Sequence, residues 1–377
     1  MIIDKVDAQT KIGQSIPLSN IVSGIAQNAS SFVRDADFSE ILKKAGFYGK
    51  YNPITGILDT NFDANLGALG IFSQVFIEQL SNRAVFYDAM LLELDRAALR
   101  YKVTQPRTNY DLFIRPYVSV SKVDIEKLEG DAKGQSTGII GGGHYFLDTS
   151  LLALYGVVEK NKNHLDDDFL NFNHNALIFG AKYSSLSSLD AYYYGATLRS
   201  LFSWGDIHRK LFATSASKGR LKSYAYGTKF YIGYNLHRDG IDVTEYLTPE
   251  LALGYFGGII KAFEMKGGPY RESFDDANYN VLYTQLNLSW FKRWQYNFAT
   301  QIDGGLRWNV NNNINTKAQI NDTKFFNHFA LSRHYVQLGT TAMFINPGGV
   351  DLSLAYKLIE SKNAASHNVS LKFHKTF

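Results

Sequence analysis

The chain has 377 residues, with 14% aromatic residues, 31 glycines, 7 prolines, no cysteine and a formal net charge of +4. The absence of cysteine excludes thiol catalysis, disulfides and zinc–thiolate sites. The small net charge, without a dense basic run interleaved with aromatic residues, argues against nucleic acid as a partner.

The combination of many aromatic residues with a mean hydropathy of -0.19 is typical of a transmembrane β-barrel. Such a barrel shows lipid only every second residue and hides polar groups inside, while aromatic residues gather at both membrane interfaces. A helical membrane protein is excluded, because no run of about 18 uninterrupted apolar residues occurs.

Residues 1–65 are polar and mixed, with a short helical pattern around Phe38, Ile41 and Leu42 that ends near Gly46. We interpret this segment as a surface-exposed linker or as the end of a preceding passenger segment. The start at Met1 lacks the basic region, apolar region and cleavage site of a secretory signal. If the chain is a barrel, we therefore expect it to be the C-terminal part of a longer exported precursor.

Residues 66–105 are predicted to form a helix, since Leu69, Phe72, Phe76 and Leu80 recur at intervals of three and four. The periodic stretch from Leu66 to Arg100, thirty-odd residues at 1.5 Å each, gives a rod of roughly 45 to 50 Å, comparable with a whole membrane including headgroups. The charged residues in this helix include Glu78, Arg83, Asp88, Glu93, Asp95 and Arg96. They would be costly against lipid but tolerable inside a polar lumen.

Residues 106–377 follow a period of two, which predicts strands. Between Tyr296 and Trp308, for example, Ile302 and Leu306 alternate with Asp303 and Arg307. The predicted strands lie near 111–121, 134–146, 149–159, 173–184, 189–203, 221–237, 243–258, 278–292, 295–309, 331–345, 349–360 and 367–377.

The connections alternate between brief turns, as at 147–149 and 292–294, and long stretches around Asp167, Ser215, Gly268 and Asn312. This alternation of short and long connections is typical of outer-membrane barrels. We predict an all-β transmembrane barrel of about 12 antiparallel strands, with one N-terminal α-helix threaded through the lumen. An even strand count returns the C-terminus to the side where the first strand begins, so the helix must cross the lumen.

Strand parity predicts a mainly basic lumenal wall. The residues placed inside are Arg115, Lys182, Arg199, Lys229, Arg307, Lys357 and Lys372, against Glu250, Asp303 and Asp351. Two interpretations stay open: Glu78, Asp88, Glu93 and Asp95 on the helix pair with this wall through weak contacts, or the charges merely line water.

No catalytic constellation, cofactor site or metal motif is evident, so we do not expect an enzyme. His164 with the acidic residues 166–168 matches no metal-binding spacing and is interpreted as a solvated loop. The run from Gly138 to Gly143 lacks the Lys-Ser/Thr of a phosphate loop. Close strand packing, or room beside the helix, explains it better.

Several sequence features resemble the translocator domain of autotransporters, from about Leu66 to Phe377. They are the helix before the first strand, the stretch 113–117, the glycine run 138–143 and the stretch 248–251. The C-terminal residues Val369, Leu371, Phe373 and Phe377 match the alternating, aromatic-ended signal that these proteins present to the barrel-assembly machinery. Lys375 departs from this pattern. The chain is similar to the toxin-like, vacuolating-cytotoxin type of the family.

The resemblance implies type V secretion in the outer membrane of a Gram-negative bacterium. Its expected partners are outer-membrane lipid, the barrel-assembly machinery and the chain's own passenger, a toxin or adhesin whose end would be residues 1–65 at the cell surface. Some members cleave an Asn-Asn bond in the lumenal helix, but Asn82 precedes Arg83 here, so self-cleavage is not expected. The alternatives are a passive outer-membrane pore, a loop-based adhesin or a soluble all-β binding module.

Overall fold

A computed structural model describes residues 5–10, 47–52, 57–62 and 68–104 and, with short gaps, residues 109–376. The gaps are 126–130, 148–149, 166–169, 186–191, 213–214, 238–244, 268–270, 321–322 and 347–349. Side chains are described from Leu69 to Met90 and from Asn109 onward, apart from a few positions at strand ends.

The N-terminal segment contains three strands that the sequence did not predict. β1 (Lys5–Thr10) is parallel to β3 (Ile57–Phe62), and β2 (Phe47–Asn52) is antiparallel to it. Strands of six residues carry too few alternations to stand out from a polar background. The helical pattern around Phe38, Ile41 and Leu42 lies outside the described residues.

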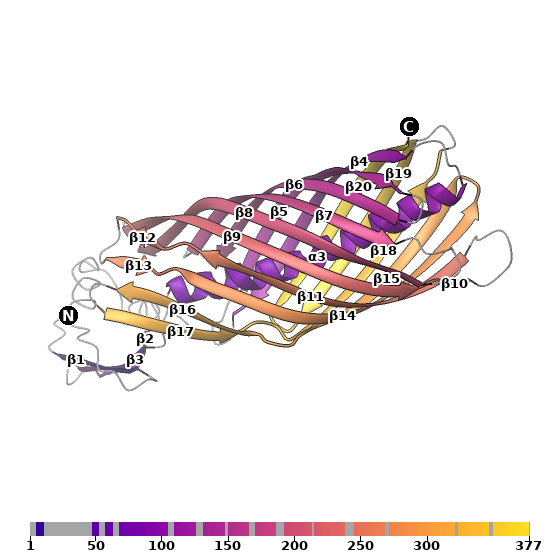
Figure 1. Cartoon of the computed structure of the whole chain (residues 1–377). Helices are drawn as coiled ribbons and strands as arrows, with labels where there is room; N and C mark the ends of the chain where they lie inside the picture. The colour runs from indigo at the N-terminus through magenta and orange to yellow at the C-terminus, as the bar shows by residue number, and fades with distance from the viewer. Residues whose placement is uncertain are drawn as a thin grey trace.

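Twelve long antiparallel strands form the barrel wall in the described part of the chain (Figure 1). They are β4 (Tyr110–Asp124), β5 (Asp131–Phe146), β6 (Ser150–Leu165), β7 (Leu170–Ser185), β8 (Tyr192–Phe212), β9 (Ser215–Tyr234), β11 (Glu245–Ile260), β14 (Ala277–Gln295), β15 (Phe298–Asn309), β18 (His334–Phe344), β19 (Val350–Ser361) and β20 (Ala364–Thr376). The two-residue β10 (Leu236–His237) follows β9 and pairs with the start of β11.

The barrel closes where the last strand pairs with the first. β20 is antiparallel to β4, with Val369 opposite Val118, and β9 pairs with β11, with Phe230 opposite Leu253. Closure leaves no unpaired edge, which is the condition for strands to stand in hydrocarbon. The predicted fold class is confirmed.

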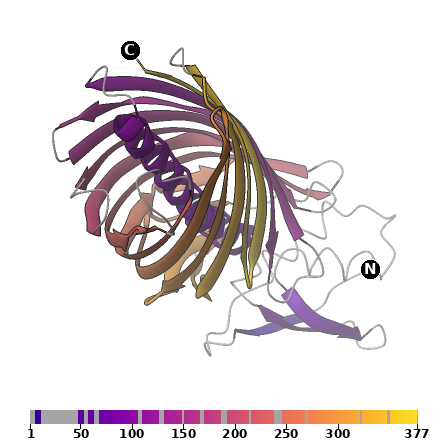
Figure 2. The ribbon, with the colours of Figure 1, turned by 90° about the vertical axis from the view of Figure 1, so that its right-hand side faces the viewer.

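The helix α3 (Ala68–Thr104) runs through the lumen, as the view along the barrel shows (Figure 2). Its 37 residues give a length of roughly 55 Å at 1.5 Å per residue. Among the described residues, no helix is both long and apolar enough to cross a membrane.

Large apolar side chains point outward and polar ones inward along the wall. Leu306, Leu354 and Phe373 are 57%, 53% and 44% exposed, whereas Gln301 and Arg307 on the same strand as Leu306 are buried. A soluble protein rarely exposes so continuous an apolar surface, whereas a membrane barrel presents it to lipid. This distribution excludes a soluble all-β module with a dry core made of the same residues.

Strands reach further at the end opposite the C-terminus, which we call the far end, than the sequence predicted. β8 and β9 continue until two residues separate them, where a long loop around Ser215 was expected. The stretches predicted as loops around Gly268 and Asn312 include a four-stranded sheet of β12 (Phe263–Met265), β13 (Glu272–Phe274), β16 (Asn313–Ile320) and β17 (Thr323–Ala330). These hairpins continue the main-chain pairing of the wall strands, which local residue patterns do not reveal.

Candidate functional site: the lumen and its helix

Helix α3 is buried on every side over its described length. Each side chain from Leu69 to Met90 is at most 9% exposed. Successive helical residues point about 100° apart, so burial of all of them requires contacts in every direction. The helix therefore fills the lumen as a plug rather than lying against one side of the wall.

The far end of the lumen is closed by an aromatic cluster around Phe72. Its ring centroid lies 5.4 Å from those of Phe76 and Phe172, 5.7 Å from that of Phe263 and 6.0 Å from that of Phe274. The sequence predicted a polar lumen, and this prediction does not hold at the far end, where apolar rings fill the lumen. Phe263 and Phe274 come from the hairpin that was expected to be a loop, so their approach to the helix gave no signal in the sequence.

The middle of the helix is held by a buried ion pair. Arg83 pairs with Glu159 of β6 and donates a hydrogen bond of 3.2 Å from Nη1 to Asn368 Oδ1 of β20. Tyr87 donates to the same Glu159 oxygen at 2.7 Å, and Tyr117 donates to it as well. Glu159 was not among the predicted wall residues, because its predicted strand ended there.

One turn further, Asp88 joins the helix to two other strands. Arg199 Nη1 of β8 donates to Asp88 Oδ1 at 2.8 Å, and the Tyr283 hydroxyl of β14 donates to Oδ2 at 3.0 Å. The Arg307 guanidinium lies 3.5 Å from the centroid of the Tyr283 ring. This contact between a helix acid and a basic wall residue is of the kind that strand parity suggested.

Glu78 is bound differently. Its Oε1 accepts a hydrogen bond of 2.7 Å from the Tyr335 hydroxyl of β18, and its Oε2 accepts one of 3.0 Å from the Ser332 backbone amide. The partners of this acid are thus a phenol and a main-chain N–H, not the basic wall residues that were expected. Parity identifies which face a residue occupies, but not its height along the barrel axis.

The remaining predicted wall residues are buried and contact other wall residues or the end of the described helix. Arg115 Nη1 lies 3.2 Å from the Met90 sulfur, and Lys357 Nζ lies 3.4 Å from Asp303 Oδ2. Lys182 and Lys229 lie over the Tyr231 ring, and Glu250 contacts Tyr193 and Asn287. Lys372 and Asp351 are buried as well, and Asp351 contacts His374.

Little space is left beside the helix. Two cavities of about 20 and 30 Å³ lie against Leu80, Arg83 and Tyr87. A cavity of this size holds about one water molecule. Beside the described side chains of α3, which are all buried, the lumen has no room for a second polypeptide segment.

A family model described as the autotransporter beta-domain matches residues 112–357. The chain belongs to the autotransporter beta-domain family. No curated protein matches the sequence. Among solved structures, the chain is similar to the translocator domain of the autotransporter NalP from Neisseria meningitidis, with a TM-score of 0.62 and 14% identity over 78% of this chain and 98% of that one. It is also similar to the transport unit of the autotransporter AIDA-I from Escherichia coli, with a TM-score of 0.55 and 12% identity over 73% and 92% of the two chains.

Three residues of the predicted assembly signal lie on β20. Val369 and Phe373 are exposed on the outer face of β20 and Leu371 is half-buried between them, while Phe377 lies outside the described residues. Glu93 and Asp95 belong to α3, but their side chains are outside the described part of the chain. His164 is exposed at the end of β6. The acidic residues 166–168 lie outside the described part of the chain.

Proposed function

We propose that this outer-membrane translocator anchors a passenger joined to its N-terminal segment and carries that segment to the cell surface. The observation that supports this most is the position of α3, which directly precedes the first barrel strand, β4, and runs through the lumen. A plain pore needs no such helix, whereas a chain whose N-terminal part lies beyond the barrel must be connected through it.

The proposed orientation places the C-terminal end in the periplasm and the far end outside the cell. At the C-terminal end, β14 and β15 are joined by the two residues 296–297. At the far end, the extra sheet of β12, β13, β16 and β17 projects beyond the wall strands. Short periplasmic turns and larger extracellular connections are the rule in outer-membrane barrels.

Epitope display on cells tests the proposal. The chain is expressed behind a secretory signal with one epitope before residue 1 and a second after residue 377. We expect intact cells to be labelled at the N-terminal epitope only, and permeabilised cells at both. N-terminal labelling that requires permeabilisation would exclude surface delivery. Heat-dependent electrophoretic mobility serves as the control that the barrel has folded.

The passenger is proposed to be a toxin or adhesin, on the resemblance of the sequence to toxin-like members of the family. Attaching the coding sequence found upstream of residue 1 and measuring its binding to, or damage of, host cells tests this class. A passenger with neither effect would refute it.

The assembly signal is proposed to be Val369, Leu371, Phe373 and Phe377, acting on the barrel-assembly machinery. Changing Phe377 to Ser is expected to lower the amount of folded barrel in cells several-fold while leaving refolding from denaturant in detergent unchanged. Equal losses in both assays would indicate a role in barrel stability instead.

A further inference from the structure

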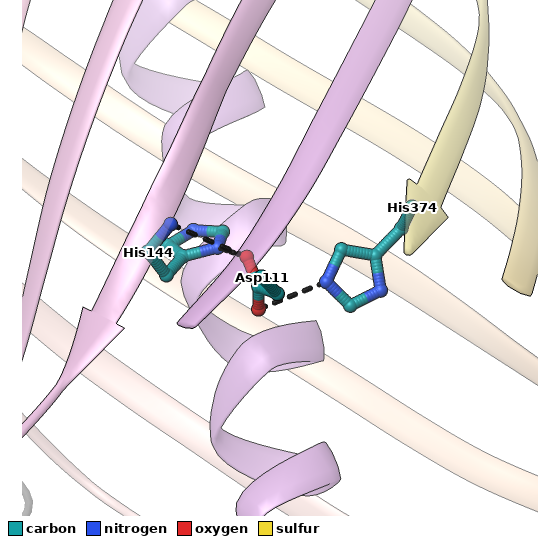
Figure 3. Close-up of side chains that lie close together, drawn as sticks. All are labelled: Asp111, His144 and His374. Atoms are coloured by element: carbon teal, nitrogen blue, oxygen red, sulfur yellow. Dashed lines mark hydrogen bonds and ion pairs between the residues drawn. The ribbon is translucent and has the colours of Figure 1, made fainter. Parts of the chain in front are cut away.

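Three buried side chains with metal-binding atoms meet at the C-terminal end of the lumen (Figure 3). Asp111 comes from β4, His144 from β5 and His374 from β20. Each is at most 3% exposed, and one ligand atom from each lies within 4.8 Å of the other two. The residues are far apart in the sequence, so their spacing gave no metal motif.

The carboxylate of Asp111 lies between the two imidazoles. Its Oδ1 is 2.5 Å from His144 Nδ1, and its Oδ2 is 2.9 Å from His374 Nε2. The other ring nitrogen of His374, Nδ1, lies 3.4 Å from Asp351 Oδ2 of β19. A carboxylate behind the distal nitrogen of a histidine is the usual outer support of a metal-binding imidazole.

Little rearrangement would admit an ion. Bonds of about 2.1 Å in tetrahedral geometry separate ligand atoms by roughly 3.3 to 3.5 Å. The two contacts of Asp111 therefore need to widen by less than about 1 Å, and a pair of ligand atoms at the 4.8 Å limit needs to close by roughly 1.3 to 1.5 Å. His144 Nε2 is buried without a hydrogen-bond partner among the described residues. Its ring can therefore turn to present either nitrogen while giving up only its bond to Asp111.

The ligand atoms of the cluster favour a divalent ion that binds nitrogen. Two imidazoles and a carboxylate suit zinc and similar transition metals, whereas calcium and magnesium prefer oxygen ligands. Lys372 is buried on the same face of β20, two residues before His374, and opposes a cation. Asp351 supplies a second negative charge that offsets it.

The cluster sits where the barrel closes. Asp111 pairs directly with His144 across β4 and β5, and His374 pairs directly with Asp351 across β20 and β19. We propose that Asp111, His144 and His374 bind one divalent transition-metal ion, which with Asp351 as outer support links the first strand to the last. The metal would stabilise the closed barrel against opening between β20 and β4.

Zinc binding to the tag-free full chain, refolded in detergent and stripped with chelator, tests the proposal. Calorimetry is expected to show one Zn²⁺ per chain, with Ca²⁺ and Mg²⁺ far weaker. His144→Ala, His374→Ala and Asp111→Asn should abolish binding, and Asp351→Asn should weaken it about 10- to 100-fold. His367→Ala is the matched control, because His367 is exposed on the same strand.

Thermal unfolding provides the second measurement. Zinc should raise the unfolding midpoint of the wild type and of His367→Ala, but not that of Asp111→Asn, which keeps the shape of the carboxylate. A wild type that binds no zinc, variants that bind it undiminished, or equal binding of calcium would overturn the proposal. The cluster would then be a hydrogen-bonded clamp between strands.

Discussion

Buried charges in the lumen are stabilised because each described helix charge meets hydrogen-bond donors or an opposite charge from a different strand. Arg83 and Glu159 illustrate this, since two tyrosines donate to Glu159 and Asn368 accepts from Arg83. Removing one partner of such a pair leaves the other charge uncompensated in a site that excludes water.

Glu159→Gln should therefore lower the free energy of unfolding by about 3 to 5 kcal/mol. The measurement is equilibrium denaturant unfolding of the refolded barrel in detergent or lipid. Adding Arg83→Met to the same chain should recover part of the loss, because the unpaired charge is then gone. Glu360→Gln, at an exposed position on β19, is the control. A loss for Glu159→Gln no larger than for that control would contradict the interpretation.

Glycines opposite inward tyrosines make a second residue-scale feature. A Cβ at Gly254 would overlap the ring of Tyr283, the residue that donates to Asp88. Gly254→Ala is expected to destabilise the barrel by about 1 to 3 kcal/mol through this overlap. At Gly304 the nearest atom to an added Cβ is 3.9 Å away, so Gly304→Ala should be nearly neutral. Unfolding titrations that fail to separate the two variants would refute the steric argument.

For single residues, the sequence predicts which face of the wall a side chain occupies better than it predicts which residue that side chain contacts. Parity placed Arg115, Lys182 and Arg307 toward the lumen, where the structure has them buried. It did not pair Arg83 with Glu159 or Glu78 with Tyr335, because those contacts depend on the stagger between strands and the height of the helix. Neither quantity is encoded in any local residue pattern.

Among the elements, the helix and the far-end hairpins act together. Phe72 on α3 meets Phe263 of β12 and Phe274 of β13, and all three belong to one buried apolar cluster with Phe76. The plug is therefore held by apolar packing at one end and by charged contacts in the middle. Burial of aromatic side chains is worth several kcal/mol in such cores. The far end should therefore be the tightest part of the seal.

Replacing both Phe72 and Phe76 by Ala is expected to increase the frequency and size of single-channel currents in planar bilayers, because the seal loses two large side chains. Phe230→Ala, on an exposed lipid-facing position of β9, should leave the currents unchanged. Currents of wild-type size and frequency in the double variant would show that ions are blocked elsewhere, and would contradict the view of this cluster as the seal.

The elements themselves were largely predictable. Each predicted strand corresponds to one of the twelve long strands, and the helix predicted over 66–105 is observed at Ala68–Thr104. The errors in the predicted strand ends gather at the far end. There β8, β9 and the sheet of β12, β13, β16 and β17 extend beyond the region of alternating lipid-facing residues. Outside the membrane, both faces of a strand can be polar, and the period of two fades.

For the whole molecule, the inward and outward faces define the solvent for which the protein is built. The barrel shows large apolar side chains on the outside, while its interior holds the charges. This arrangement is stable only where hydrocarbon surrounds the wall, and it adds a lipid-facing apolar surface to the apolar clusters that pack between the helix and the wall.

A charge placed on the lipid-facing surface should therefore destabilise the barrel according to its depth. Leu338 is 54% exposed and pairs with Gly304, midway between Phe298 and Trp308 on β15. Leu338→Lys is expected to reduce the stability of the barrel folded in lipid vesicles by about 2 to 4 kcal/mol. Asn313→Lys, exposed on the far-end strand β16, should change it little, because that position faces water. Since the added charge is the same, the difference between the variants isolates the surrounding solvent. Equal effects would mean that β18 is not embedded in hydrocarbon at Leu338.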